Sequence, residues 1–133
     1  PLGWLPEELD KLFASIAREE IEVYSAPGSL WWRCLINTLL DTGERIGAIK
    51  LVRREHLHPE HLLVPAEFRK GKTRDRLYKL SKTTMDDIRL LLKHHDQPEI
   101  FPWDRNVNQV YYRYKKILQR AGLPATSKHK LHA

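Results

Sequence analysis

The chain has 133 residues, which is enough for one domain with one hydrophobic core, and 41% of them are hydrophobic, as in an ordinary folded protein. Lys and Arg outnumber Asp and Glu by 23 to 17, and the resulting net charge of +6 favours an anionic partner such as nucleic acid, although many proteins that bind no nucleic acid carry a similar excess. The single cysteine, Cys34, excludes a disulfide framework and indicates a reducing compartment, so we expect a cytoplasmic protein.

Neither a signal peptide nor an apolar run long enough to span a membrane is present in the sequence, so no membrane partner is expected. The chain begins at Pro1 rather than Met, which indicates a fragment, and residues 1–3 are set aside as candidate tag residues. A first helix is predicted over residues 4–20, with Pro6 and acidic residues in its first turn. Residues 27 and 28, Pro-Gly, end the following connection, and Ser29 is expected to cap a central helix.

The central stretch, residues 35–50, contains a helix that stops and starts again. Its apolar pattern ends at Gly43 and resumes with Ile46, Ile49 and Leu51, which leaves Arg45 at a helix start. A guanidinium held between two packed helices suits a phosphate-binding site, because its planar fork binds two oxygens and stays charged. A solvated arginine on a helix-turn-helix corner is the commoner outcome of such a pattern.

Residues 53–60 form a polar stretch that we expect to be a solvated connection. His56, His58 and His61 could ligate zinc by residue type alone. No cysteine lies nearby, however, and Pro59 interrupts the run, so the sequence does not favour a metal site.

Two strand-like runs follow, at residues 62–68 and 76–80, and the glycine between them indicates the turn of a β-hairpin. The tip would carry five cations: Arg69, Lys70, Lys72, Arg74 and Arg76. Such a tip either prevents an edge strand from pairing with another chain or reaches towards a nucleic-acid backbone.

Two further helices are predicted, over residues 81–94 with Ser81 or Thr83 as cap, and over residues 107–121 with Asn106 or Asn108 as cap. Gly122 ends the second of them. Its inner side is apolar, and its outer side is basic: Arg113, Lys115, Lys116 and Arg120. This outer side either lies along a DNA backbone or is a solvated face.

These motifs, in this order, resemble those of the tyrosine recombinases, the phage-integrase family. Residues 42–48 read Thr-Gly-Glu-Arg-Ile-Gly-Ala and are similar to the first arginine motif of that family, Thr-Gly-x-Arg-x-x-Glu. Ala48 replaces the acidic residue that usually supports the arginine. The basic link resembles the Lys-x-Gly-Lys-x-Arg of the family's hairpin, in a slightly longer form, and residues 101–102, Phe-Pro, resemble the stretch that precedes a helix there.

The resemblance implies a mainly α fold with a small antiparallel β-hairpin, and a partial, truncated catalytic domain over residues 4–133. In this family a tyrosine hydroxyl attacks one DNA strand and forms a 3′-phosphotyrosine, without metal or cofactor. By the same resemblance Arg45 would bind a non-bridging oxygen of the scissile phosphate. Lys70, or as second choice Lys72, would protonate the leaving oxygen, and His132 would assist proton transfer as the first half of the family's His-x-Leu-Arg motif.

A second register would use residues 129–131 for that motif, and neither register supplies the family's second arginine. The tyrosines of the chain all precede the motif, whereas the family's nucleophile follows it, so we expect this chain alone to be inactive. The remaining contacts to double-stranded DNA are expected from these side chains: Arg69, Arg74, Arg76, Arg113, Lys116, Lys128 and Lys130. The full-length protein is expected to be bacterial or phage-encoded and to self-associate on DNA.

An alternative from another class is a non-catalytic helical module that contacts the DNA backbone through the hairpin and the last helix. A metal-dependent nuclease is less favoured, because the sequence shows no cluster of carboxylates.

Overall fold

The structure is a computed structural model, and it describes residues 4–71 and 74–124. Over these residues the chain forms α1 (Pro6–Ile16), α2 (Gly28–Thr42), α3 (Ile46–Ile49), β1 (His61–Val64), β2 (Arg76–Lys79), α4 (Lys82–Leu92) and α5 (Asn108–Ala121). Short 3-10 helices lie at Arg54–His56 and Ala66–Phe68. The prediction of a mainly α fold with one small antiparallel hairpin is therefore confirmed. No helix of the described segments is long and apolar enough to cross a membrane.

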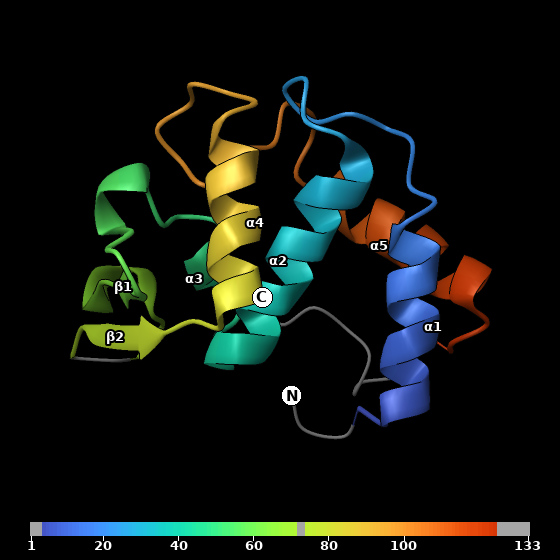
Figure 1. The fold of residues 1–133 in the computed structure, drawn as a ribbon, viewed down its shortest axis with the longest axis horizontal. Coiled ribbons are helices and arrows are strands. Elements are labelled where there is room, and N and C mark those ends of the chain that lie inside the picture. The colour runs from blue at the N-terminus through green and yellow to red at the C-terminus, as the bar shows by residue number, and fades with distance from the viewer. Residues whose placement is uncertain (1–3, 72–73, 125–133) are drawn as a thin grey trace.

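Helix α2 lies at the centre of the molecule, with α4 on one side and α1 and α5 on the other (Figure 1). Trp32, Cys34 and Leu35 of α2 are at most 1% exposed. The helix begins directly after Pro27, and no side chain caps it, so the expected Ser29 cap is wrong. It ends at Gly43, whose φ of 69° only glycine adopts at little cost.

Charged side chains attach α4 to α2. The guanidinium of Arg33 donates to both carboxylate oxygens of Asp87, at 2.8 and 3.1 Å. At the start of α4, Ser81 N donates to Asp41 Oδ2 at 3.0 Å, and Ser81 Oγ accepts from Thr84 N, as expected of a cap residue. The bond from Ser81 to Asp41 lies at the end of α2, and the ion pair of Arg33 with Asp87 lies nearer its start, so α4 is attached to α2 at two points.

Helix α1 packs on α5 and is shorter than predicted. It ends at Ile16 rather than near residue 20, because contacts to α5 replace the next turn. Ser15 Oγ donates to Ile117 O at 2.8 Å, and Arg120 Nη2 donates to Ser15 O at 2.7 Å. Ser15 O also accepts from Arg18 N at 3.0 Å, so Arg120 adds a second donor to a carbonyl at the end of α1.

The hairpin pairs β1 with β2 in an antiparallel register from His61 opposite Lys79 to Val64 opposite Arg76. Leu62 and Val64 are fully buried, so β1 carries the inner face of the hairpin. The first strand was predicted to continue to residue 68, but it ends at Val64. Pro65, which has no N–H to donate, is followed by the 3-10 turn at Ala66–Phe68.

The polar stretch before β1 is mostly exposed, as the sequence indicated, but Arg54 within it is tied to the rest of the fold. Arg54 donates to Gln97 O at 2.8 Å and to Leu92 O at 3.1 Å, which ties this stretch to the end of α4. Close to these contacts, Ile100 N donates to Val52 O at 3.1 Å. Leu51, predicted on the apolar face, is instead 43% exposed.

Candidate functional site

Arg45 lies where α2 stops and α3 starts, as predicted. Its backbone is extended, with φ of −81° and ψ of 151°, and the residues that follow are anchored in the core, since Ile46 is 3% and Ile49 0% exposed. The side chain is exposed, and within the described segments it makes no hydrogen bond or ion pair. A fixed backbone and a free guanidinium are what an anion-binding arginine needs.

A pocket of about 500 Å³ joins this corner to the hairpin. One wall consists of residues around the break between α2 and α3, including Arg45 and Ala48. The other wall consists of the chain between β1 and β2, including Lys70 and Gly71, together with Tyr78 of β2. The structure therefore brings Arg45 and Lys70, two of the residues predicted to act on a phosphate, to the same pocket.

The buried carboxylate of Glu44 holds the two walls together. Glu44 Oε2 accepts from Arg69 Nε at 2.7 Å and also from the Tyr78 hydroxyl. The side chain of Glu44 is 8% exposed and that of Arg69 is 10% exposed. Burial, followed by the hydrogen bond to Glu44, raises the pKa of Tyr78, so this hydroxyl remains a donor at neutral pH.

Arg69 was predicted to be one of the exposed cations of the hairpin tip, but its side chain is only 10% exposed. Its guanidinium turns inward to Glu44, and its Nη1 donates across the hairpin to Arg74 O at 3.1 Å. Arg74 and Arg76 are exposed as predicted, and the Arg76 guanidinium lies 5.5 Å from the centre of the Tyr78 ring. Arg69 is thus a structural cation, while Lys70, Arg74 and Arg76 remain accessible to an anion.

The basic side of α5 also divides into paired and exposed residues. Arg113 donates to both oxygens of Glu19, at 2.7 and 3.1 Å, and the Glu19 side chain is only 1% exposed. Arg113 was predicted to contact DNA, but its guanidinium is occupied by this carboxylate. Lys116 is exposed and lies 5.3 Å from the centre of the Tyr112 ring.

Figure 1 places α5 at the opposite end of the molecule from the hairpin, so Lys116 and Lys70 do not share a pocket. Four further predicted residues, Lys72, Lys128, Lys130 and His132, lie outside the described residues. The described part of the chain holds no group of three His, Cys, Asp or Glu side chains that could bind a metal.

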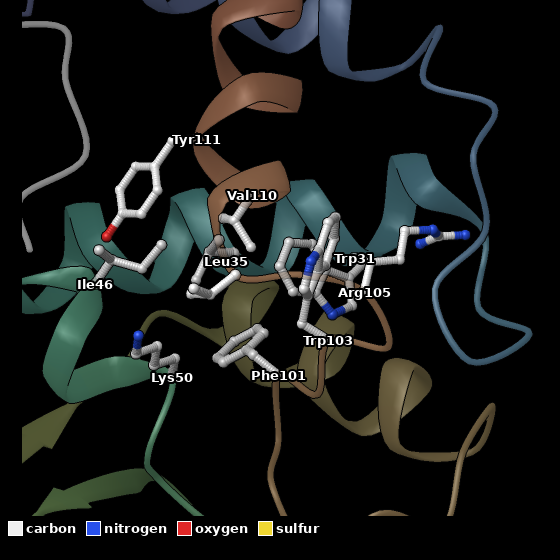
Figure 2. Close-up of a pocket in the computed structure, with 10 residues that line it drawn as sticks. Trp31, Leu35, Ile46, Lys50, Phe101, Trp103, Arg105, Val110 and Tyr111 are labelled. Atoms are coloured by element: carbon white, nitrogen blue, oxygen red, sulfur yellow. The ribbon is translucent and has the colours of Figure 1, made fainter.

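A second hollow, of about 220 Å³, lies beside α2 (Figure 2). Trp31 and Leu35 of α2 line it together with Phe101, Trp103 and Val110. Apart from Lys50 and Arg105 it is lined by apolar or aromatic side chains. The pocket at Arg45 instead combines two exposed cations, Arg45 and Lys70, with the ion pair between Arg69 and Glu44. Chemistry on a phosphate therefore has its candidate residues in the pocket at Arg45.

Comparison with solved structures identifies the fold as that of part of a site-specific tyrosine recombinase. One similar protein is the XerH site-specific recombinase, whose pre-cleavage complex with difH substrate matches 96% of this chain with a TM-score of 0.70 at 19% identity. Its post-cleavage complex with palindromic difH substrate gives a TM-score of 0.69 at the same identity. This chain spans 38% of the length of XerH in both cases.

The comparison confirms the predicted recombinase-like fold. No protein-family model and no curated protein sequence matches the chain.

Proposed function

We propose that this chain is part of the catalytic domain of a site-specific DNA recombinase and binds the DNA phosphate at which strands are cut and rejoined. The observation that carries the proposal is the meeting of Arg45 and Lys70 at one pocket in a fold shared with a recombinase over 96% of the chain. The DNA-bound state of XerH supports double-stranded DNA as the partner.

In the proposed reaction Arg45 binds a non-bridging oxygen of the scissile phosphate and neutralises the charge that grows on the equatorial oxygens in the transition state. Lys70, or Lys72 beside it, gives a proton to the 5′ oxygen as that oxygen leaves. A tyrosine hydroxyl loses its proton and takes the place of the 5′ oxygen, forming a 3′-phosphotyrosine. The bond to the protein conserves the energy of the broken bond, so rejoining requires no cofactor.

His132, within this chain, would assist the proton transfer. The second arginine and the nucleophile are proposed to come from outside the 133 residues. Accordingly, this chain is proposed to bind DNA but not to cut it. The full-length protein would be bacterial or phage-encoded, would act in the cytoplasm, and would self-associate on its substrate.

Fluorescence anisotropy with a labelled DNA duplex across a salt series tests the binding step. Loss of one phosphate contact should reduce the steepness of the plot of log affinity against log salt concentration by about one. Arg45→Ala and Lys70→Ala should therefore each make the salt dependence of binding less steep by about one. Lys11→Ala is the matched control, because Lys11 is also exposed but lies on α1, away from the hairpin. If Arg45→Ala, Lys70→Ala and Lys11→Ala bind DNA with the same affinity and the same salt slope, the proposed site is wrong.

One observation favours the alternative of a non-catalytic DNA-binding module. Ala48 is 4% exposed beside the pocket, and Arg45 has no carboxylate partner within the described segments. A longer polypeptide that includes the second arginine and a downstream tyrosine distinguishes the two functions. Capture of DNA in a denaturation-resistant adduct, abolished by Arg45→Ala, would establish the recombinase, and binding without an adduct would establish the module.

A further inference from the structure

We propose that Glu44 is a positioning residue, which holds the hairpin against the α2–α3 corner so that Arg45 and Lys70 face the same phosphate. The inference rests on the proposed function and deepens it. Glu44 immediately precedes Arg45, and its ion-pair partner Arg69 immediately precedes Lys70. One ion pair of 2.7 Å between the preceding residues therefore sets the separation of the two proposed phosphate ligands.

The corner side of this connection is rigid. Thr42 Oγ1 donates to Thr38 O at 2.8 Å, and Glu44 N donates to Thr42 Oγ1 at 3.1 Å. Gly43, between them, has the left-handed conformation that closes α2. Glu44 thus leaves the end of α2 in a fixed direction, and its carboxylate is presented to the hairpin.

The hairpin side is held at both arms. Arg69, on the arm that follows β1, reaches Glu44 and the carbonyl of Arg74 on the returning arm. Tyr78, on β2, donates its hydroxyl to the same carboxylate oxygen. Two donors from opposite arms meeting on one oxygen restrict the hairpin more than either could alone, because sliding of one arm past the other would break a bond.

The alternative role for Glu44, as a carboxylate that acts on substrate, fits the contacts less well. A free carboxylate beside Arg45 would repel a phosphate, whereas here one oxygen already accepts from a guanidinium and a hydroxyl and the side chain is 8% exposed. These contacts leave Glu44 to act through its neighbours on either wall of the pocket, which is why we assign it a positioning role rather than a catalytic one.

Glu44→Gln and Tyr78→Phe, made in the 133-residue chain, test the inference by NMR without DNA. Glu44→Gln removes the negative charge that attracts the Arg69 guanidinium, and Tyr78→Phe removes the hydroxyl that donates to Glu44. Both substitutions keep the shape of the side chain. We expect the amide signals of Lys70 and Gly71 to shift and broaden while those of α1 and α5 remain in place. Glu67→Gln is the control, because Glu67 is exposed on the same arm and makes no ion pair in the described segments. Unchanged hairpin signals in both variants would overturn the inference.

A double-mutant cycle on DNA binding then tests the consequence for the site. If Arg45 and Lys70 hold the same phosphate, Arg45→Ala and Lys70→Ala should depart from additivity by about 2- to 10-fold in affinity. In the Glu44→Gln background the two effects should become additive. Coupling that persists there would overturn the positioning role.

If neither Arg45→Ala nor Lys70→Ala alters DNA binding, the proposed function fails. The NMR signals of Glu44→Gln and Tyr78→Phe still decide separately whether Glu44 positions the hairpin. The two failures are therefore distinguishable.

Discussion

Arg113→Ala is expected to destabilise the fold rather than to weaken a DNA contact. Arg113 donates to both oxygens of Glu19, whose side chain is 1% exposed. Among the residues that the structure describes, Arg120 is the second cation that pairs with this carboxylate, at 3.6 Å. Removal of Arg113 therefore leaves a buried carboxylate with one long ion-pair contact.

The expected magnitude follows from this geometry. Removal of one partner of a fully buried ion pair costs about 3–5 kcal/mol. The cost is reduced here, because Arg113 is 23% exposed, so water reaches part of the site, and because Arg120 remains nearby. We expect a loss of about 2 kcal/mol in the free energy of unfolding, which lowers the midpoint of urea unfolding by about 1 M for a slope of about 2 kcal/mol per M.

Lys116→Ala is the matched control on the same helix. Lys116 is exposed, so its removal should change the free energy of unfolding by less than about 0.5 kcal/mol but should reduce the salt slope of DNA binding by about one. Arg113→Ala, measured where it is fully folded, should leave that slope unchanged. If Arg113→Ala unfolds at the same urea concentration as the wild type but has a reduced salt slope of DNA binding, the expectation is wrong.

Three further outcomes are expected. Burial raises the pKa of the Cys34 thiol to about 12, so a thiol reagent at mildly alkaline pH should modify the chain only as fast as it unfolds; rapid modification of the folded chain would contradict this. The pKa of Tyr78 is raised in the folded chain, first by burial and then by Glu44. The protonated Tyr78 hydroxyl therefore stabilises the folded chain fully below the ordinary tyrosine pKa, and this contribution is lost as pH rises through the raised pKa. In an NMR titration of labelled tyrosine, Glu44→Gln should lower that pKa, and an unchanged value would show that the contact is absent. Ser81→Ala should cost about 1 kcal/mol in urea unfolding through loss of the α4 cap, whereas Thr83→Ala should cost much less, and equal losses would contradict the cap assignment.

The helices that carry the core were predictable because their signals are local. The apolar pattern of α2 ends where a glycine follows, and α5 ends at Gly122 in the same way, each with a positive φ. The cap of α4 was also predicted, since Ser81 contacts a backbone N–H three residues away. Signals of this kind depend on neighbours along the chain, and the sequence contains them in full.

Some errors have a long-range cause and others a local one. The last residues of α1 contact Arg120, more than a hundred positions later, whereas β1 ends at Val64 because Pro65 follows it. The polar stretch before β1 is mostly exposed, as predicted, but Arg54 within it binds carbonyls at the end of α4 and after it. No periodicity over a short window contains such partners.

The candidate site divides in the same way. Arg45 and Lys70 were predicted through motifs that occupy a few consecutive positions each. Glu44, Arg69 and Tyr78 could not be assigned their common role, because Glu44 is separated by 25 positions from Arg69 and by 34 from Tyr78. The sequence shows Glu44 next to Arg45 and Arg69 next to Lys70, but it does not show that Glu44 and Arg69 form an ion pair with each other.

Pairing with a buried carboxylate explains why net charge alone was a poor guide to the proposed DNA-binding surface. The pair of Arg113 with Glu19 leaves the net charge unchanged, while the guanidinium of Arg113 is occupied and its side chain is only 23% exposed. Arginine suits this pair because its fork binds both carboxylate oxygens. Arg45 differs in combining a backbone fixed by α2 and α3 with a side chain that has no carboxylate partner in the described segments. A phosphate is the ligand that such an arginine is best placed to bind.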